Sequence, residues 1–274
     1  MPPASFWLQQ LPVAAARPLL PGSRSADVCI VGGGFTGLWT AYELRRDAPE
    51  LDVVVLEAEQ VGFGASGRNG GWVLGALEGA REGWAARRGG RAAALAQERA
   101  IQATVDEVGS VVAREGIECG WVKGGSLHVA RSELQLERLR AHVAADRAWG
   151  VEEPDSVLLE ADAAAARVRV DGICGAHFTP HCARVQPGAL VRGLADACER
   201  VGVVIHEGTR VTEIAPGVAR TPLGDVRARV VVQATEGYTA SLRGHRRDLL
   251  PMGSSMVATE VIDEATWAQL GWSN

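Results

Sequence analysis

The sequence predicts an α/β fold, and three observations near the start of the chain lead to that prediction. Residues 28–31, Val-Cys-Ile-Val, form a short apolar run without alternation, which is typical of a strand buried on both faces. Leu38, Ala41 and Tyr42 then recur on one face of a helix, and a second apolar run, "DVVVLE", follows at 52–57. Strand, helix and strand within about 30 residues make a βαβ unit, so we expect parallel strands with a right-handed crossover.

The bulk composition is that of an ordinary globular protein. The chain has 274 residues, of which 47% are hydrophobic and 22% charged, enough for one large domain or two ordinary ones. The formal net charge of −5 excludes a strongly basic nucleic-acid-binding surface. No apolar run is long enough to cross a bilayer, and the N-terminus lacks the pattern of a secretory signal. We therefore expect a soluble cytoplasmic protein without a membrane span.

The cysteines and histidines give no metal-binding pattern. The five cysteines are odd in number and contain no C-x-x-C pair, which argues against a disulfide scaffold or a zinc module and favours a reducing compartment. His177 and His181, with Cys182 adjacent, are separated by Pro180, and no carboxylate completes the group. The other histidines are scattered: His128, His142, His206 and His245. The sequence therefore predicts no metal site.

Helices are predicted at three further places. Residues 1–26 hold five prolines and are expected to be an irregular leader. A helical pattern begins near residue 90, and another contains Leu136, Leu139 and Val143. A third helix is expected from Pro187, a favourable first-turn residue, to Gly202.

Strands are predicted between and after these helices. Residues 120–131, "GWVKGGSLHVAR", have the pattern of a hairpin that turns at Gly124-Gly125. Residues 229–238, "RVVVQATEGY", are predicted as a buried strand with a polar, glycine-containing end. No helix is expected between residue 262 and residues 272–274. Two short strands are expected within 203–214, and extended chain at 175–185 and 249–262.

The glycine turn between the first strand and the first helix predicts a dinucleotide site. Gly32 allows a tight turn, Gly34 lets a pyrophosphate approach the backbone, and Gly37 lets the helix pack closely on the strand. The free amides and the positive end of the helix would then face the phosphates. Glu57 ends the next strand 20 residues past Gly37, where a carboxylate can bind a ribose diol. A glycine turn without a ligand is the simpler alternative.

A second glycine-rich loop follows at residues 62–71, "GFGASGRNGG". Ser66 and Arg68 can bind phosphate, and Gly70 and Gly71 can admit a flat ring system. The glycine turn alone leaves NAD and FAD open. The second loop favours FAD, because a ligand that continues past the pyrophosphate needs backbone in place of side chains there. A flexible loop between domains is the alternative interpretation.

Four stretches occur in the order found in a known family: "DVCIVGGGFTGLWTAYELRR", "VVVLEAEQVGFGASGRNGGW", "QPGALVRGLADACERVGVVIHEGTRVTEI" and "VVVQATEGYTASL". The sequence resembles FAD-dependent amine and amino-acid oxidoreductases of the glycine/D-amino-acid oxidase-like superfamily, most of all gamma-glutamylputrescine oxidase-like members. The resemblance covers residues 27 to about 262.

This resemblance implies a Rossmann-like FAD-binding domain, residues 27–75 and 183–248, interleaved with a mostly antiparallel α+β substrate domain, residues 76–182 and 249–274. It also implies FAD as cofactor. Some relatives attach flavin to a histidine where this sequence has Arg68, so we expect non-covalent FAD. The residues expected to contact it are Gly32, Gly34, Phe35, Thr36, Gly37, Glu57, Ala58, Ser66, Arg68, Asn69, Gly70, Gly71, Val211, Ala234 and Thr235.

The resemblance implies an enzyme that oxidises the CH–NH bond of a small amine or amino acid by hydride transfer to flavin. No side-chain acid or base is required, so no catalytic residue is assigned. Trp72 is expected either to wall the substrate pocket or to fill the core. Two features depart from the family: Glu236 stands where many relatives carry an uncharged residue, and relatives continue well past the end of this sequence.

Two alternatives to this enzyme therefore stay open. We expect the chain to be truncated, so one alternative is a non-catalytic dinucleotide-binding fragment. An NAD-linked dehydrogenase is a weaker one, disfavoured by the second glycine loop. The sequence leaves the substrate, the electron acceptor and the oligomeric state open.

Overall fold

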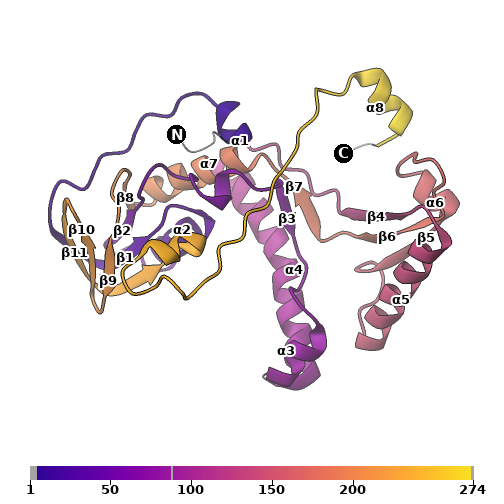
Figure 1. Cartoon of the computed structure of the whole chain (residues 1–274), viewed down its shortest axis with the longest axis horizontal. Coiled ribbons are helices and arrows are strands. Elements are labelled where there is room, and N and C mark those ends of the chain that lie inside the picture. The colour runs from indigo at the N-terminus through magenta and orange to yellow at the C-terminus, as the bar shows by residue number, and fades with distance from the viewer. Residues whose placement is uncertain (1–4, 88, 273–274) are drawn as a thin grey trace. The chain divides into compact units, whose positions relative to one another are not determined.

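The computed structural model describes residues 5–87 and 89–272, and the chain divides into two compact units (Figure 1). Each unit is built from segments that are far apart in the sequence. Unit 1 comprises Met1–Gly70, Arg114–Cys119 and Gln186–Met256, and unit 2 comprises Gly71–Ala113, Gly120–Val185 and Val257–Asn274. The first four residues of the predicted leader and the predicted end at 273–274 lie outside the described residues.

Unit 1 contains a mixed sheet that is mainly parallel. Its strand order is β8 (Val204–His206), β2 (Val53–Leu56), β1 (Arg24–Val31), β11 (Gly224–Gln233), β10 (Val218–Thr221) and β9 (Glu213–Ala215). The strands from β8 to β11 are parallel, and β9 and β10 pair antiparallel. Val28 of β1 lies opposite Val53 of β2, so the parallel pairing predicted for the βαβ unit is confirmed.

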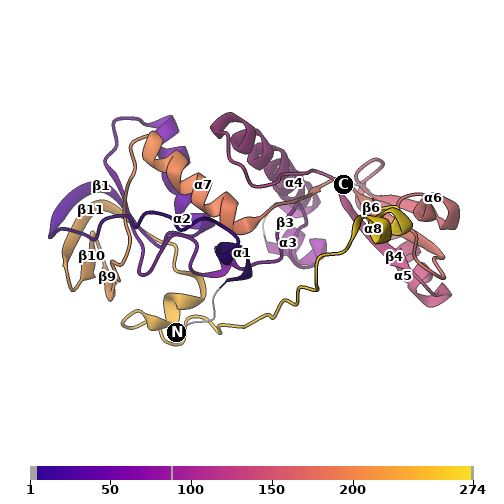
Figure 2. The same cartoon turned by 90° about the horizontal axis from the view of Figure 1, so that it is seen from above.

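Both faces of the central strands are buried, as their continuous apolar runs predict. Cys29 and Val31 belong to a core cluster on one face of the sheet. On the other face, α2 (Phe35–Asp47) buries Leu38, Ala41 and Tyr42 completely. It packs against β2 and against α7 (Pro187–Arg200), which lies beside it (Figure 2). Helix α7 begins with its proline in the first turn and is followed by Gly202 with φ +89°, as the sequence predicts.

Two predictions for unit 1 need correction. The leader is not wholly irregular, because Ser5 caps a short helix, α1 (Phe6–Gln9). The strand predicted at 229–238 exists but ends at Gln233, where a 3-10 helix, η2 (Glu236–Ser241), follows shortly after. The strand is also only half buried. Val226 is fully buried, whereas Val230, four residues later on the same face of the strand, is 53% exposed. An apolar sequence allows a strand to be buried. Whether its side chains are buried depends on which other elements of the fold pack against them.

Unit 2 is mostly antiparallel where it forms sheets, as the resemblance implies. A sheet of order β4 (Ser126–Ala130), β6 (Gly175–Thr179) and β5 (Val157–Glu160) packs against α5 (Glu133–Trp149). The other described elements of the unit are β3 (Trp72–Leu74) paired with β7 (Cys182–Arg184), the helices α3 (Arg81–Arg87), α6 (Ala161–Ala165) and α8 (Glu264–Leu270), and most of α4 (Gly90–Glu115).

Two predictions for unit 2 are wrong. The hairpin at 120–131 does not form: β4 pairs with β6, and Val122 instead bridges to Arg184. The true partners lie about 50 residues later in the chain, beyond the reach of a local pattern. The chain also has a helix near its end, α8, which Asp263 caps by accepting a hydrogen bond from the Thr266 amide.

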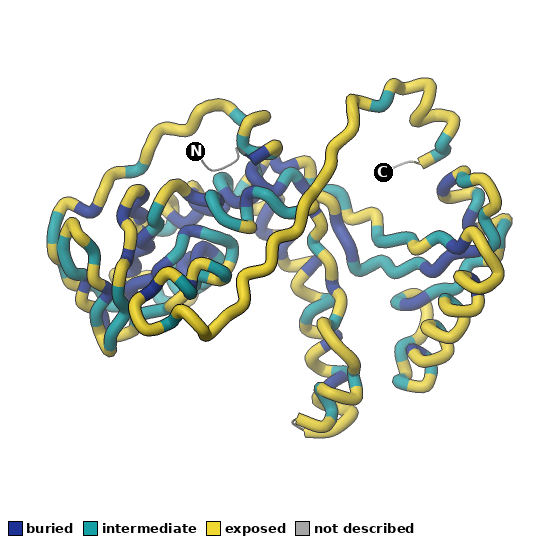
Figure 3. Tube along the Cα trace, in the orientation of Figure 1, coloured by how far each residue is buried: buried dark blue, intermediate teal, exposed yellow. Residues whose placement is uncertain are grey.

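The segment before α8 has no regular element. Residues 249–261 are exposed throughout (Figure 3). Across residues 5–87 and 89–272, no helix has both the length and the apolar character needed to cross a bilayer.

Candidate functional site

The turn after β1 is built from glycines whose missing side chains are structurally required. Gly32 has φ +115°, and a Cβ there would lie 2.4 Å from the Ala234 carbonyl oxygen. A Cβ on Gly37 would lie 2.0 Å from the carbonyl oxygen of Gly32. Neither glycine can therefore be replaced without moving backbone, and the start of α2 lies directly against the turn.

The N-terminus of α2 opens onto a pocket of unit 1. Gly34 is the N-cap residue, and the first turn contains no acidic side chain. The Phe35 amide donates to Ser66 Oγ at 2.9 Å, in the 3-10 helix η1 (Ala65–Gly67). Gly34 and Thr36 line the pocket, and amides in a first helical turn have no intrahelical acceptor. This end of α2 therefore presents a positive dipole and free donors to an anion.

Glu57 supports the same turn from the end of β2. Its Oε2 accepts from the Gly33 amide at 2.7 Å, and its Oε1 accepts from the Glu59 amide at 2.9 Å. Burial raises the pKa of Glu57, although these two amide hydrogen bonds favour the charged form. The carboxylate lies at the pocket wall with its orientation already fixed.

The pocket gathers most of the residues that the sequence analysis selected. Those that line it are Gly32, Gly34, Phe35, Thr36, Glu57, Ala58, Ser66, Val211, Ala234 and Thr235. They come from the ends of β1 and β2, the start of α2, η1, the segment before β9 and the segment after β11. These carboxyl-terminal ends of parallel strands are where open α/β sheets bind ligands.

The remaining selected residues lie outside this lining. Gly37 packs behind the turn. Arg68 Nε donates to the Phe63 carbonyl, and Asn69 Nδ2 donates to the carbonyls of Ala65 and Ser66. Gly70 is open, and Gly71 belongs to unit 2. Their contact with a cofactor stays a prediction.

The structure adds pocket residues that the sequence analysis did not select. Phe63 and Tyr238 line the pocket with their ring centroids 6.4 Å apart. Arg210 and Glu59 form an exposed ion pair of 2.5 Å at its wall. Each of these four residues lies within three positions of a residue predicted to contact the cofactor. Proximity to those predicted residues in the sequence could have identified them.

Glu236 also lines this pocket. It has φ 42°, and its carboxylate accepts a hydrogen bond from the Gly237 amide. The extra anion noted in the sequence therefore belongs to the wall of the pocket. Trp72 of β3, by contrast, is 71% exposed, so it does not fill the core of unit 2.

A second pocket, in unit 2, has charged and imidazole side chains among its lining residues. It contains Asp146 and His177, which are both buried. Burial lowers the pKa of His177 to about 4. Burial opposes ionisation of Asp146, but hydrogen bonds from Ser156 and Arg81 outweigh it and lower the Asp146 pKa. His181 lies elsewhere, with its Nε2 2.8 Å from Asp155 Oδ1.

Comparison with known proteins relates this chain to FAD-dependent oxidoreductases. The family model described as FAD dependent oxidoreductase matches residues 27–274. Gamma-glutamylputrescine oxidoreductase of Escherichia coli (strain K12) is 32% identical over 251 residues, 88% of this chain and 57% of that protein. Mitochondrial sarcosine dehydrogenase of Homo sapiens is 25% identical over 266 residues, 92% of this chain and 27% of that protein.

Solved structures agree with the sequence comparison. The crystal structure of glycine oxidase from Geobacillus kaustophilus matches with a TM-score of 0.63 and 26% identity, covering 81% of this chain and 58% of that one. The chain thus spans less than three fifths of the length of each of these relatives.

Proposed function

This chain belongs to the family of FAD-dependent oxidoreductases, and on that premise we propose that unit 1 binds FAD non-covalently in the pocket at the Gly32–Gly37 turn. The observation that carries the proposal is the composition of the pocket wall. A helix N-terminus with free amides and an oriented carboxylate at the end of the neighbouring strand lie on the same pocket. These groups fit the diphosphate and the ribose of a dinucleotide.

Each part of the wall has a proposed role. The first-turn amides of α2 bind the diphosphate, with the Ser66 hydroxyl beside them. The Glu57 carboxylate accepts from ribose hydroxyls and repels a 2′-phosphate. The backbone of Val211 contacts the adenine, and Ala234 and Thr235 cover the dinucleotide. Arg68, Asn69, Gly70 and Gly71 run beside the diphosphate and the flavin.

We propose that the whole protein oxidises the CH–NH bond of an amine or amino acid. The substrates named for the relatives, gamma-glutamylputrescine, sarcosine and glycine, share a nitrogen on a carbon that carries hydrogen. When bound, the flavin would supply the hydride acceptor. The residues of this chain bind and orient the reacting groups and exclude water, and no side-chain acid or base is assigned to the reaction.

The first test is the visible absorption spectrum of the purified protein before and after acid precipitation. We expect flavin bands that move into the supernatant. Glu57→Gln should weaken FAD binding about tenfold, because it replaces a charged acceptor by a neutral one. Glu59→Gln is the matched control on the same wall, and we expect a change of less than about threefold.

The outcomes separate the proposals. A colourless protein that takes up no added FAD would refute the cofactor proposal, and bands that stay with the pellet would refute non-covalent binding. Binding of NAD without FAD would favour a nicotinamide-linked dehydrogenase.

A dinucleotide-binding chain without turnover is the second candidate, because this chain spans 57% of the length of its 32% identical relative. Binding and turnover therefore need separate measurements. If FAD binds, anaerobic addition of amines and amino acids should bleach the flavin absorption of an active enzyme. A flavin that dithionite reduces but no amine reduces would support the non-catalytic alternative.

A further inference from the structure

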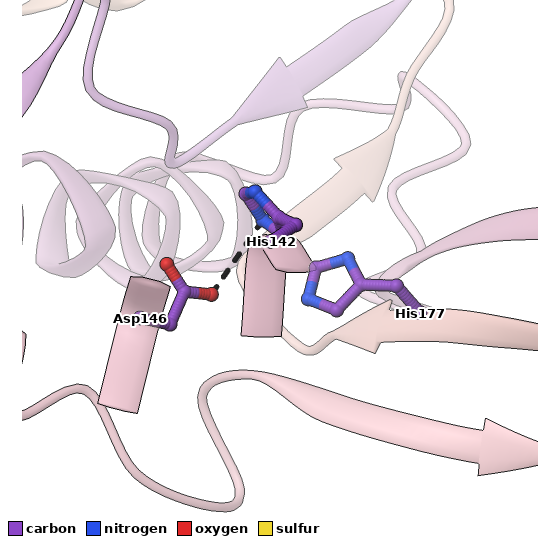
Figure 4. A group of neighbouring side chains, drawn as sticks. All are labelled: His142, Asp146 and His177. Carbon is purple, nitrogen blue, oxygen red and sulfur yellow. Dashed lines mark ion pairs between the residues drawn. The ribbon is translucent and has the colours of Figure 1, made fainter. Parts of the chain in front are cut away.

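Three potential ligand side chains meet in unit 2, away from the glycine turn (Figure 4). His142 and Asp146 are four residues apart on α5, and His177 comes from β6. One ligand atom from each lies within 4.8 Å of the others. We propose that His142, Asp146 and His177 form a binding site for a divalent transition-metal ion such as Zn²⁺. The three residues are the N₂O donor set that this class of ion prefers.

One of the three ligand spacings is already close to that of a tetrahedral site. Ligand atoms about 2.0–2.1 Å from a zinc ion are about 3.3 Å from one another. His142 Nε2 and Asp146 Oδ2 are already 3.5 Å apart. The His142 side chain is 56% exposed, so it can turn toward the other two without disturbing the core. The side chain that has to turn is His142, the exposed member of the three.

Asp146 is held in place by hydrogen bonds to both of its oxygens. Arg81 Nη1 donates to Oδ1 at 2.6 Å, and Ser156 Oγ donates to Oδ2 at 2.5 Å. Such outer contacts orient the carboxylate ligand of a metal site. The Ser156 hydroxyl is buried, so the orientation does not depend on solvent.

Arg81 does not cancel the charge that a cation needs. Its Nε and Nη2 make a fork to both oxygens of Glu98, at 2.7 and 2.6 Å. One guanidinium therefore faces two carboxylates, those of Glu98 and Asp146, and the three side chains together carry one net negative charge. A divalent ion would compensate that buried charge.

His177 points the correct nitrogen at the site. Its Nε2 is 3.0 Å from Ser156 Oγ. The single hydroxyl proton of Ser156 goes to the carboxylate of Asp146, so Nε2 donates to the hydroxyl oxygen. Binding a metal through Nε2 requires the neutral ring to carry its proton on Nδ1, which moves a proton within the ring and leaves the total charge unchanged.

The test uses the full chain with any affinity tag removed, stripped of metal with EDTA and dialysed. Titration with Zn²⁺, in competition with a chromophoric chelator, should give one site per chain. Co²⁺ should give d–d absorption bands of a tetrahedral N/O site. Neither readout needs FAD or turnover, so the result is independent of the proposed function.

Two single variants make the test specific. His142→Ala truncates an exposed side chain, so it should keep the fold and weaken Zn²⁺ binding by at least about tenfold. His128→Ala is the matched control: His128 is an exposed histidine on β4 that lines the same pocket but is not one of the three. We expect it to change the affinity less than about twofold.

Three results would overturn the proposal: no Zn²⁺ binding by the parent chain, unchanged binding by a folded His142→Ala variant, or equal losses in both variants. If only the histidines at other positions bound zinc, the double variant His142→Ala, His177→Ala would retain the parent affinity. A far-ultraviolet circular dichroism melt on each variant checks that the fold is kept.

Discussion

The two pockets of this molecule are built in opposite ways. One wall of the unit 1 pocket is built from backbone: a glycine turn, the first amides of α2 and the peptide groups that follow β11. The pocket of unit 2 relies on polar side chains, in a network in which Arg81 and Ser156 both donate to the Asp146 carboxylate. The first is open to a ligand because side chains are missing. The second depends on charged side chains that are already partnered.

This difference has a consequence for how each pocket responds to mutation. Adding atoms should damage the first pocket, because its glycines leave no room. Removing atoms should damage the second, because each lost group leaves a buried partner unsatisfied. Four substitutions or conditions test this contrast.

The largest effect is expected from Gly37→Ala in unit 1. The new Cβ would lie 2.0 Å from the backbone oxygen of Gly32, which cannot rotate away. We expect the free energy of unfolding to fall by about 4 kcal/mol in urea denaturation. Gly70→Ala is the control, since a Cβ there has no neighbour within 4 Å, and should change stability by less than about 0.5 kcal/mol. Equal small effects would mean that the turn relaxes freely.

The matching deletion in unit 2 is Asp146→Ala. It leaves the Arg81 guanidinium and the Ser156 hydroxyl without their buried partner, and we expect a loss of about 3 kcal/mol. Arg140→Ala on the same helix removes an exposed ion pair with Glu133 and should cost less than about 0.5 kcal/mol. Urea denaturation of both variants measures the difference. A loss below 1 kcal/mol for Asp146→Ala would show that the network is not tightly coupled.

The pH dependence of stability tests the same network without a deletion. Burial, with smaller contributions from His142, His128 and Arg147, holds the pKa of His177 at about 4, below its ordinary value of 6.5, although the Asp146 carboxylate opposes the shift. Between these values the unfolded chain binds more protons than the folded one, so stability falls as pH drops from 6.5 to 4. We expect a loss of about 2 kcal/mol in metal-free buffer. His177→Gln should remove that part of the slope, and a slope parallel to that of the parent chain would contradict the assignment.

The smallest effect is expected from Ser66→Ala, which removes a side-chain contact at the start of α2. Losing the acceptor for the Phe35 amide should cost about 1 kcal/mol. Ser110→Ala on α4, whose hydroxyl bonds only to its own helix in the described residues, is the control and should be neutral within about 0.5 kcal/mol. Thermal melts of the ligand-free proteins compare the two.

The contrast also explains which structural features could be predicted from the sequence. The parallel pairing of β1 and β2, the buried face of α2 and most of the lining of the unit 1 pocket could be predicted, because a local pattern fixes them. The turn and its helix occupy consecutive residues, and Glu57 follows after a single crossover. The half-exposed Val230 could not be predicted, since burial depends on what packs against the strand.

The unit 2 network could not be predicted from a local sequence pattern. Arg81, Glu98, Asp146, Ser156 and His177 come from separate segments spread over about a hundred residues. In the sequence His177 lies near His181 and Cys182, whereas the fold brings it to His142 and Asp146. The mispredicted hairpin has the same cause. Strand β4 pairs with β6, which lies about 50 residues later in the sequence.

The Ser66 contact has a further consequence, for the free energy of ligand binding. Because Ser66 accepts from one donor of α2 and Glu57 accepts from two backbone amides, side chains of the chain itself hold the glycine turn in place. These contacts offset the conformational entropy lost in ordering the turn and the start of α2, so a ligand bound there would not have to supply that free energy.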